Sequence, residues 1–222
     1  ILRRAVAIAA MMAVLMASYS ALEPTLQADH DGTPNTVHCG DAVTANVVLT
    51  ADLDCTSHLG NVLSVKADGI TIDGQGHDIL APVAAIGILV SGRQQIEVRN
   101  ITVDSRLGIR VTGGSNNLID GVTLIREARG IAGVQIVNSS NNTVQNSTMG
   151  NHSAGIRLDG NSDSNTIQGN SATGGGSGVW ASGGGDDNVI QDNDFSGNNH
   201  GIDARGNTGQ RNSFVDNDMS DE

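Results

Sequence analysis

The 222-residue sequence predicts an all-β solenoid, in which short strands wind into about seven stacked coils. Three observations support this fold class: a repeat of 21 to 25 residues, short runs in which apolar and polar residues alternate, and turns rich in Gly, Asn and Asp between those runs. Such alternation is typical of strands, whereas helical apolar residues recur about every 3.6 positions. The repeat is clearest where Gly precedes Ile or Val, at Gly87, Gly108, Gly133, Gly155, Gly178 and Gly201.

Four positions in each repeat carry apolar side chains, and aligning the repeats turns these positions into columns. Because neighbouring coils lie about 4.8 Å apart, each side chain is expected to pack on its equivalent in the next coil. Small and β-branched side chains suit such a narrow interior. The columns are Ile88, Ile109, Val134, Ile156, Val179, Ile202; Val90, Val111, Ile136, Leu158, Ala181, Ala204; Val98, Ile119, Val144, Ile167, Ile190, Phe214; and Val103, Leu124, Met149, Ala172, Phe195, Met219.

Two further inward columns change from aliphatic residues to asparagine along the chain. An inward amide is costly unless it is hydrogen-bonded. In a stack, each amide can donate to the carbonyl oxygen of the Asn one coil away, so we predict asparagine ladders inside the rod. The columns are Ile96, Asn117, Asn142, Asn165, Asn188, Asn212; and Ile101, Val122, Ser147, Asn170, Asn193, Asn217.

Repeats such as GIRLDGNSDSNTIQGNSAT (Gly155–Thr173), with the lead-in CGDAVTANVVLTADLDC and the segment ADGITIDGQGHDI, resemble the right-handed parallel β-helix proteins of the pectate-lyase-like superfamily. The resemblance covers residues 61–222 and implies a single-stranded right-handed parallel β-helix. This superfamily includes polysaccharide lyases, hydrolases, esterases, epimerases, phage tailspikes and proteins without enzymatic activity. The resemblance therefore implies carbohydrate as the partner, but no particular activity.

Residues 1–20 are expected to be a signal peptide. Arg3 and Arg4 precede the apolar run Ala5–Ala17, and small residues follow before Ala21, where cleavage is expected. An uncleaved membrane anchor is the alternative. With the signal removed, we expect no membrane segment in the mature chain, which would be secreted, periplasmic or on the cell surface.

Residues 21–60 are expected to form an N-terminal entry segment that leads into the β-helix domain at 61–222. The segment contains both cysteines of the chain, Cys39 and Cys55, and two cysteines in an exported protein most often pair. The resulting disulfide would stabilise the fold by about 3 kcal/mol through loop closure. The sequence shows no CxxC or Cys/His spacing for a zinc site.

The net charge of −12, with Lys66 as the single lysine, excludes two classes of partner. Nucleic acids and anionic membranes both bind through basic patches, which this composition does not provide. We therefore expect neither as a partner.

The outward positions of the strands that follow the repeat glycines form a polar stripe, which includes the single tryptophan, Trp180. An exposed ring flanked by hydrogen-bonding groups suits a sugar, which is apolar on its faces and hydroxylated at its edges. Covering a neighbouring loop is the alternative role for Trp180. We predict a carbohydrate-binding surface made of Trp180, Arg110, Gln135 and Asp159.

The same stripe offers a candidate catalytic group: Asp203, His200, Arg157 and Arg205. A lyase or an epimerase acting on an acidic polysaccharide needs a base and a positive charge that neutralises the substrate carboxylate. Hydrolysis by paired carboxylates fits less well, because Asp159 and Asp203 lie two coils apart.

The Asp-Asn-Asp triplets near the C-terminus place four carboxylates in two neighbouring coils, from Asp192, Asp194, Asp216 and Asp218. Calcium binds oxygen ligands in flexible arrangements, so a calcium site is one interpretation, and a solvated acidic face is the other. No other cofactor is predicted. An open last coil would also expose unpaired strand edges, which predicts self-association there.

Three functions remain open. The leading hypothesis is an exported polysaccharide-binding or surface scaffold protein, and the second is a polysaccharide-active enzyme. A third, weaker resemblance is to the periplasmic β-helix protein that helps to mature a copper reductase. A Met/His/Cys copper cluster would support the third hypothesis, and the sequence shows none.

Overall fold

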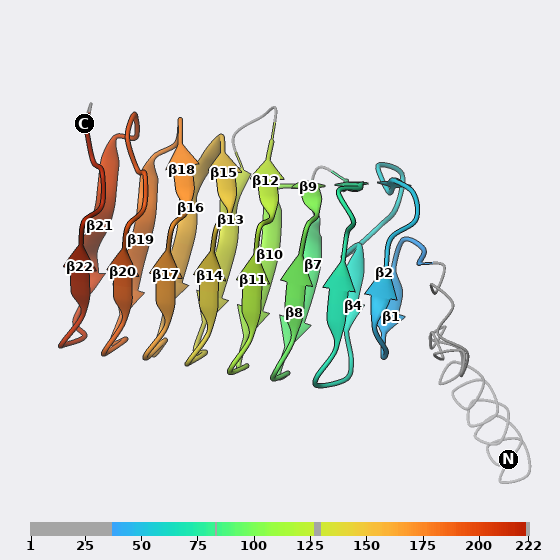
Figure 1. Cartoon of the computed structure of the whole chain (residues 1–222), viewed down its shortest axis with the longest axis horizontal. Coiled ribbons are helices and arrows are strands. Elements are labelled where there is room, and N and C mark those ends of the chain that lie inside the picture. Colours follow the sequence, from blue (N-terminus) through green and yellow to red (C-terminus); the bar gives the residue numbers. More distant parts are fainter. Residues whose placement is uncertain (1–36, 83, 127–129, 221–222) are drawn as a thin grey trace, which may run out of the picture.

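The computed structural model describes residues 37–82, 84–126 and 130–220, so the predicted signal peptide (1–20) and the start of the entry segment lie outside the described residues. The described part is all-β and forms a parallel β-solenoid with three sheets, whose strands stack along a rod (Figure 1). Sheet A contains β1 (Asp41–Val43), β4 (Leu63–Val65), β7 (Ile86–Ser91), β10 (Leu107–Thr112), β13 (Gly130–Val137), β16 (His152–Asp159), β19 (Ser177–Gly183) and β21 (His200–Asn207).

The other two sheets contain shorter strands. Sheet B contains β2 (Val47–Val48), β5 (Thr71–Asp73), β8 (Glu97–Arg99), β11 (Leu118–Asp120), β14 (Thr143–Gln145), β17 (Thr166–Gln168), β20 (Val189–Gln191) and β22 (Ser213–Val215). Sheet C contains β3 (Leu53–Asp54), β6 (Asp78–Leu80), β9 (Thr102–Asp104), β12 (Thr123–Ile125), β15 (Thr148–Gly150) and β18 (Ser171–Thr173).

Each coil takes one strand from each sheet in turn, and seven coils begin with β4 and its successors in sheet A. In the last two coils, an isolated bridge between Asp194 and Asp218 continues sheet C. The entry segment contributes a further coil, because β1, β2 and β3 pair in parallel with β4, β5 and β6. The described part of the entry segment is thus built into the rod.

The aliphatic columns are confirmed as the core. Ile109 pairs with Val134, Val134 with Ile156, and Ile156 with Val179, and these side chains are fully buried. The last coil is less covered, because β21 and β22 have a neighbouring strand on one side only; Phe214, for example, is 46% exposed.

The predicted asparagine ladders are also confirmed. In the first, Nδ2 of each Asn donates to Oδ1 of the Asn in the next coil, at 2.9 Å from Asn117 to Asn142 and 3.0 Å from Asn142 to Asn165. The same oxygens accept hydrogen bonds from the backbone N–H of the preceding Asn. The first ladder continues through Asn188 to Asn212, and a second joins Asn170, Asn193 and Asn217.

The ladders allow a polar column to lie inside an aliphatic rod. A buried polar group without a partner costs about 1–3 kcal/mol, whereas a satisfied one contributes about 1 kcal/mol of stability. Asn165, which is fully buried, donates to both Asn188 and the carbonyl of Ser139, and its own Oδ1 accepts two hydrogen bonds from Asn142.

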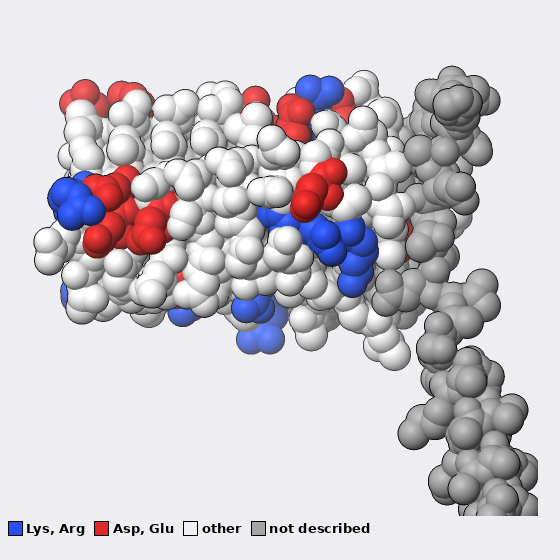
Figure 2. Space-filling view, turned by 90° about the horizontal axis from the view of Figure 1, so that it is seen from below, with Lys and Arg blue, Asp and Glu red and all other residues white. Residues whose placement is uncertain are grey.

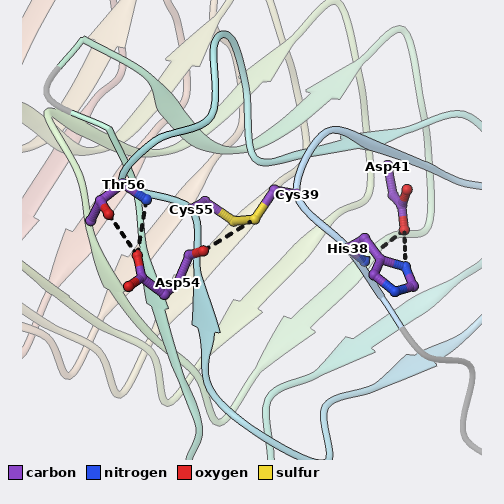
Figure 3. The surroundings of a disulfide bond; sticks show 6 residues. All are labelled: His38, Cys39, Asp41, Asp54, Cys55 and Thr56. Carbon is purple, nitrogen blue, oxygen red and sulfur yellow. Dashed lines mark hydrogen bonds and ion pairs between the residues drawn. A yellow bond between two sulfur atoms is a disulfide. The ribbon is translucent and has the colours of Figure 1, made fainter.

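The predicted disulfide joins Cys39 and Cys55, with a Cα–Cα distance of 5.6 Å (Figure 3). It ties the chain before β1 to the end of β3, so it closes the entry coil. Polar contacts flank it: the His38 backbone N–H donates to Asp41, and the Thr56 hydroxyl donates to Asp54.

One buried corner of the rod contains polar groups that bond with no other described residue. His152, at the start of β16, is 2% exposed, and neither of its ring nitrogens has a hydrogen-bond partner among the described residues. The same holds for the buried Ser105 hydroxyl. Burial lowers the pKa of His152, and the nearby backbone of Ser105 and Gly150 offsets only part of that effect.

Substitution of Asn165 by Ala should lower the free energy of unfolding by about 3 kcal/mol, because it leaves buried N–H groups of Asn142 without an acceptor. Urea denaturation measures this change. Asn161 is an exposed control in the same coil, and Asn161→Ala should change stability by less than about 0.5 kcal/mol. Equal losses in the two variants would contradict the ladder as a source of stability.

The pH dependence of stability should reveal His152. Its pKa in the folded state lies below the value of 6.5 for a free side chain, so the unfolded state binds more protons as pH falls below 6.5. The contribution of the neutral imidazole is therefore present above pH 6.5 and is lost progressively below it. Denaturation curves between pH 7.5 and pH 5.5 should show a smaller loss for His152→Leu than for the wild type, and parallel losses would refute this role.

Candidate functional site

The outer face of sheet A brings the predicted carbohydrate-binding residues into one stripe. Strand pairing places Arg110 beside Gln135, Gln135 beside Arg157, Arg157 beside Trp180, and Trp180 beside Asp203. This order is the one that the repeat predicts. Because these strands are paired in register, each residue lies about 4.8 Å from the next along the rod.

Asp159, at the end of β16, is the centre of the hydrogen bonding on this face. Its carboxylate accepts hydrogen bonds from Arg157 Nε (2.7 Å), Gln135 Nε2 (2.7 Å) and the Ser182 hydroxyl (2.7 Å). Burial alone would raise the pKa of Asp159, but these three donors outweigh burial and lower it. Asp159 is therefore ionised and fixes Arg157 and Gln135 in place. Ser182 was not predicted as a site residue, because nothing in the sequence indicates that its hydroxyl bonds with Asp159 in the neighbouring coil.

Arg157, held in this way, lies over the ring of Trp180, with Cζ 5.2 Å from the ring centroid. A guanidinium at this distance makes a cation–π contact. Trp180 itself remains 37% exposed, so part of the indole is available to a ligand. Next along the stripe from Gln135, Arg110 has a buried Nε that finds no hydrogen-bond partner in the part of the chain that the structure describes.

The predicted catalytic group is only partly assembled. Asp203 is 6% exposed and is bound by Arg205 through two hydrogen bonds, from Nε (2.9 Å) and Nη2 (2.6 Å). The Arg205 side chain thereby lowers the pKa of Asp203 to about 2. His200 is exposed at the start of β21 and adds only a small electrostatic effect, and Arg157 bonds with Asp159 instead.

Arg205 does not lie in the position that the repeat predicts. Ser182 and Arg205 each lie four residues after the repeat glycine of their coil, so a regular repeat would pair them. The register shifts by one residue after Trp180 instead, and Ser182 pairs with Gly206. An extra residue in β21 accounts for this shift, as in a β-bulge.

The four aspartates predicted to bind calcium do not form a set of ligands in this structure. Among residues 37–82, 84–126 and 130–220, no group of three or more His, Cys, Asp or Glu side chains is arranged to hold a metal ion. Asp194 and Asp218 lie opposite each other, but each accepts a hydrogen bond from the backbone N–H two residues further on. Asp192 and Asp216 occupy turn positions with φ of 56° and 51°.

A different group of charges meets near the C-terminal end. Arg211 forms ion pairs with Asp187 (2.6 Å) and Asp186 (3.5 Å). Figure 2 shows acidic side chains gathered beside basic ones on one face at that end of the rod. Because these pairs are exposed to solvent, they contribute little to stability.

The model of one protein family, described as "Periplasmic copper-binding protein (NosD)", matches residues 42–221, which is most of the chain. The chain belongs to the NosD family. That family is periplasmic. No helix in the part of the chain that the structure describes is long and apolar enough to cross a membrane. A search of curated proteins found no match.

Solved structures of two polysaccharide-acting proteins share the fold. A mutant of the periplasmic alginate epimerase AlgG has a TM-score of 0.53 at 14% sequence identity, over 78% of this chain and 47% of that chain. The catalytic domain of a GH87 alpha-1,3-glucanase in complex with nigerose has a TM-score of 0.51 at 15% identity, over 85% and 41%. Our chain thus spans less than half the length of either, and these identities establish the fold alone.

The description of the family names copper as the metal that its members bind. Copper favours thiolate, thioether and imidazole ligands. Within the described residues, both cysteines are joined in the disulfide, Met149 is buried in the aliphatic core, and Met219 is exposed in the last coil. The described histidines take part in no group of three or more His, Cys, Asp or Glu side chains that could hold a metal ion, so these residues assemble no His/Cys copper site.

Proposed function

We propose that this NosD-family protein binds polysaccharide through the outer face of sheet A. The observation that carries the proposal is the exposed Trp180, stacked with an arginine that Asp159 fixes in place. A ring for stacking and oriented hydrogen-bonding groups are what a sugar-binding surface requires. The names of AlgG and the GH87 glucanase, both polysaccharide-acting proteins with this fold, support the same class of partner.

Binding fits this surface better than catalysis. A general acid needs a raised pKa, yet the pKa values of both Asp159 and Asp203 are lowered. An aspartate with a pKa of about 2 is also a weak base at neutral pH. We therefore propose a binding or scaffold role outside the cytoplasm, in the periplasm or at the cell surface, and treat the lyase or epimerase role of Asp203 and His200 as the alternative.

Trp180→Ala should weaken polysaccharide binding about tenfold, which corresponds to about 1.4 kcal/mol, because a stacking surface is lost. Affinity electrophoresis in gels containing alginate or an alpha-1,3-glucan measures the retardation. Gln191→Ala, on the outer face of sheet B, is the control and should migrate as the wild type does. Equal retardation of wild type and Trp180→Ala would reject the surface. Release of unsaturated or reducing ends by the wild type, abolished in Asp203→Ala, would favour the enzyme instead.

Copper handling in the maturation of a metalloenzyme is the second candidate, and the family match favours it. It needs donors that residues 37–82, 84–126 and 130–220 do not assemble. When the full chain is titrated with Cu(I) against a chromogenic chelator, we expect no stoichiometric complex. A tight complex with one copper per chain would favour the copper function over polysaccharide binding.

A further inference from the structure

A groove of about 440 Å³ lies on a different side of the rod from the Trp180 stripe. It is formed where β5, β8 and β11 of sheet B turn into β6, β9 and β12 of sheet C. Its lining includes Gln75, Gly76, Asn100, Thr102, Gly121 and Thr123.

A buried carboxylate orients two amides of the groove. Asp73 is 4% exposed, and its Oδ2 accepts a hydrogen bond from Gln75 Nε2 (2.9 Å), while its Oδ1 accepts one from Asn100 Nδ2 (3.3 Å). Arg99 Nε donates to the same carboxylate, at 2.9 Å. Because each amide is held through its nitrogen, its oxygen points away from Asp73. The Asn100 oxygen faces Gly121, since a Cβ placed on Gly121 would lie 3.7 Å from it.

Gly121 keeps the groove open. It has φ of 60° and occupies the turn position that Asn100 and Asn146, both with φ of 50°, occupy in the coils on either side. An Asn side chain is therefore compatible with this backbone, and Gly121 leaves its space empty. At the other end of the groove, a Cβ on Gly76 would meet no atom within 4 Å.

Two hydroxyls complete the lining. Thr102 and Thr123 are paired across β9 and β12, and both are partly exposed on the outward face of sheet C. Neither hydroxyl is bonded to another described residue, whereas the Asp73 carboxylate is saturated by its donors. The groove thus offers oriented carbonyl acceptors and free hydroxyls, and no unpaired charge.

We propose that this groove is a second binding site, for a neutral sugar or a short neutral oligosaccharide. Sugar hydroxyls both donate and accept hydrogen bonds, so they match amide oxygens and threonine hydroxyls side by side. An anionic ligand would meet the amide oxygens and the Asp73 carboxylate behind them, so the groove disfavours it. This site does not depend on the Trp180 surface.

Gly121→Asn tests the site, because it fills the groove with a side chain that the same turn accepts in neighbouring coils. Gly169→Asn is the matched control: Gly169 has φ of 62° at the equivalent turn position, beside Asn146, and does not line the groove. Thr123→Val removes one hydroxyl at nearly constant shape. The probes are maltohexaose, cellohexaose and laminarihexaose, added to the full chain at up to millimolar concentration. Amide chemical shifts locate binding by NMR.

At least one probe should shift the amide signals of Gly76, Gly121 and Thr123. Gly121→Asn should then weaken binding at least tenfold and Thr123→Val about fivefold, the latter being the value of one neutral hydrogen bond. Gly169→Asn and Trp180→Ala should leave these shifts unchanged, which separates this site from the sheet A surface. Absence of shifts with all three probes, or unchanged affinity in Gly121→Asn, would overturn the proposal.

Discussion

The structure depends on one constraint: every coil must lie directly over the next, so that each inward side chain meets its own equivalent. Parallel pairing in all three sheets imposes this alignment through the backbone. Aliphatic residues satisfy it by packing, and asparagines satisfy it by bonding amide to amide, as Asn142 and Asn165 do. A column can therefore change from Ile96 to Asn117 without any change in the path of the chain.

The same alignment explains what could be predicted from the sequence. Inward columns repeat with the coil, so the core, the ladders around Asn165 and the stripe from Arg110 to Trp180 follow from a one-dimensional alignment. Arg205 did not, because one extra residue in β21 breaks the register. The hydrogen-bond donors to Asp159 could not be predicted either, because the rotamers of exposed side chains decide which of them meet, and an alignment of repeats does not give rotamers. The groove beside Gly121 is formed by the turns of three neighbouring coils together, and an alignment of the repeats does not show the shape of those turns.

Charge is distributed unevenly over the faces of the rod. On sheet A, Arg157 pairs with Asp159 and Arg205 pairs with Asp203. Arg157 also lies over the ring of Trp180. In the groove at the corner between sheets B and C, the buried Asp73 carboxylate is saturated by its donors and the lining residues are neutral. A solenoid thus separates different surface chemistries on one simple scaffold, which fits a family whose fold is shared with polysaccharide-acting proteins.

The ladders give the rod a polarity. Each bond between two ladder amides runs the same way, from Nδ2 of one Asn to Oδ1 of the Asn in the following coil. Several of these Nδ2 groups, such as that of Asn165, donate a second hydrogen bond to a backbone carbonyl of the preceding coil. Within a ladder, each Asn therefore offers its N–H groups as donors, and the Asn of the following coil supplies Oδ1 as the acceptor. Loss of one ladder side chain therefore affects its two neighbours unequally. Without the Asn165 side chain, two N–H groups of Asn142 lose their acceptor, whereas Asn188 Oδ1 still accepts from the backbone N–H of residue 165. The two ends of each ladder are therefore chemically different.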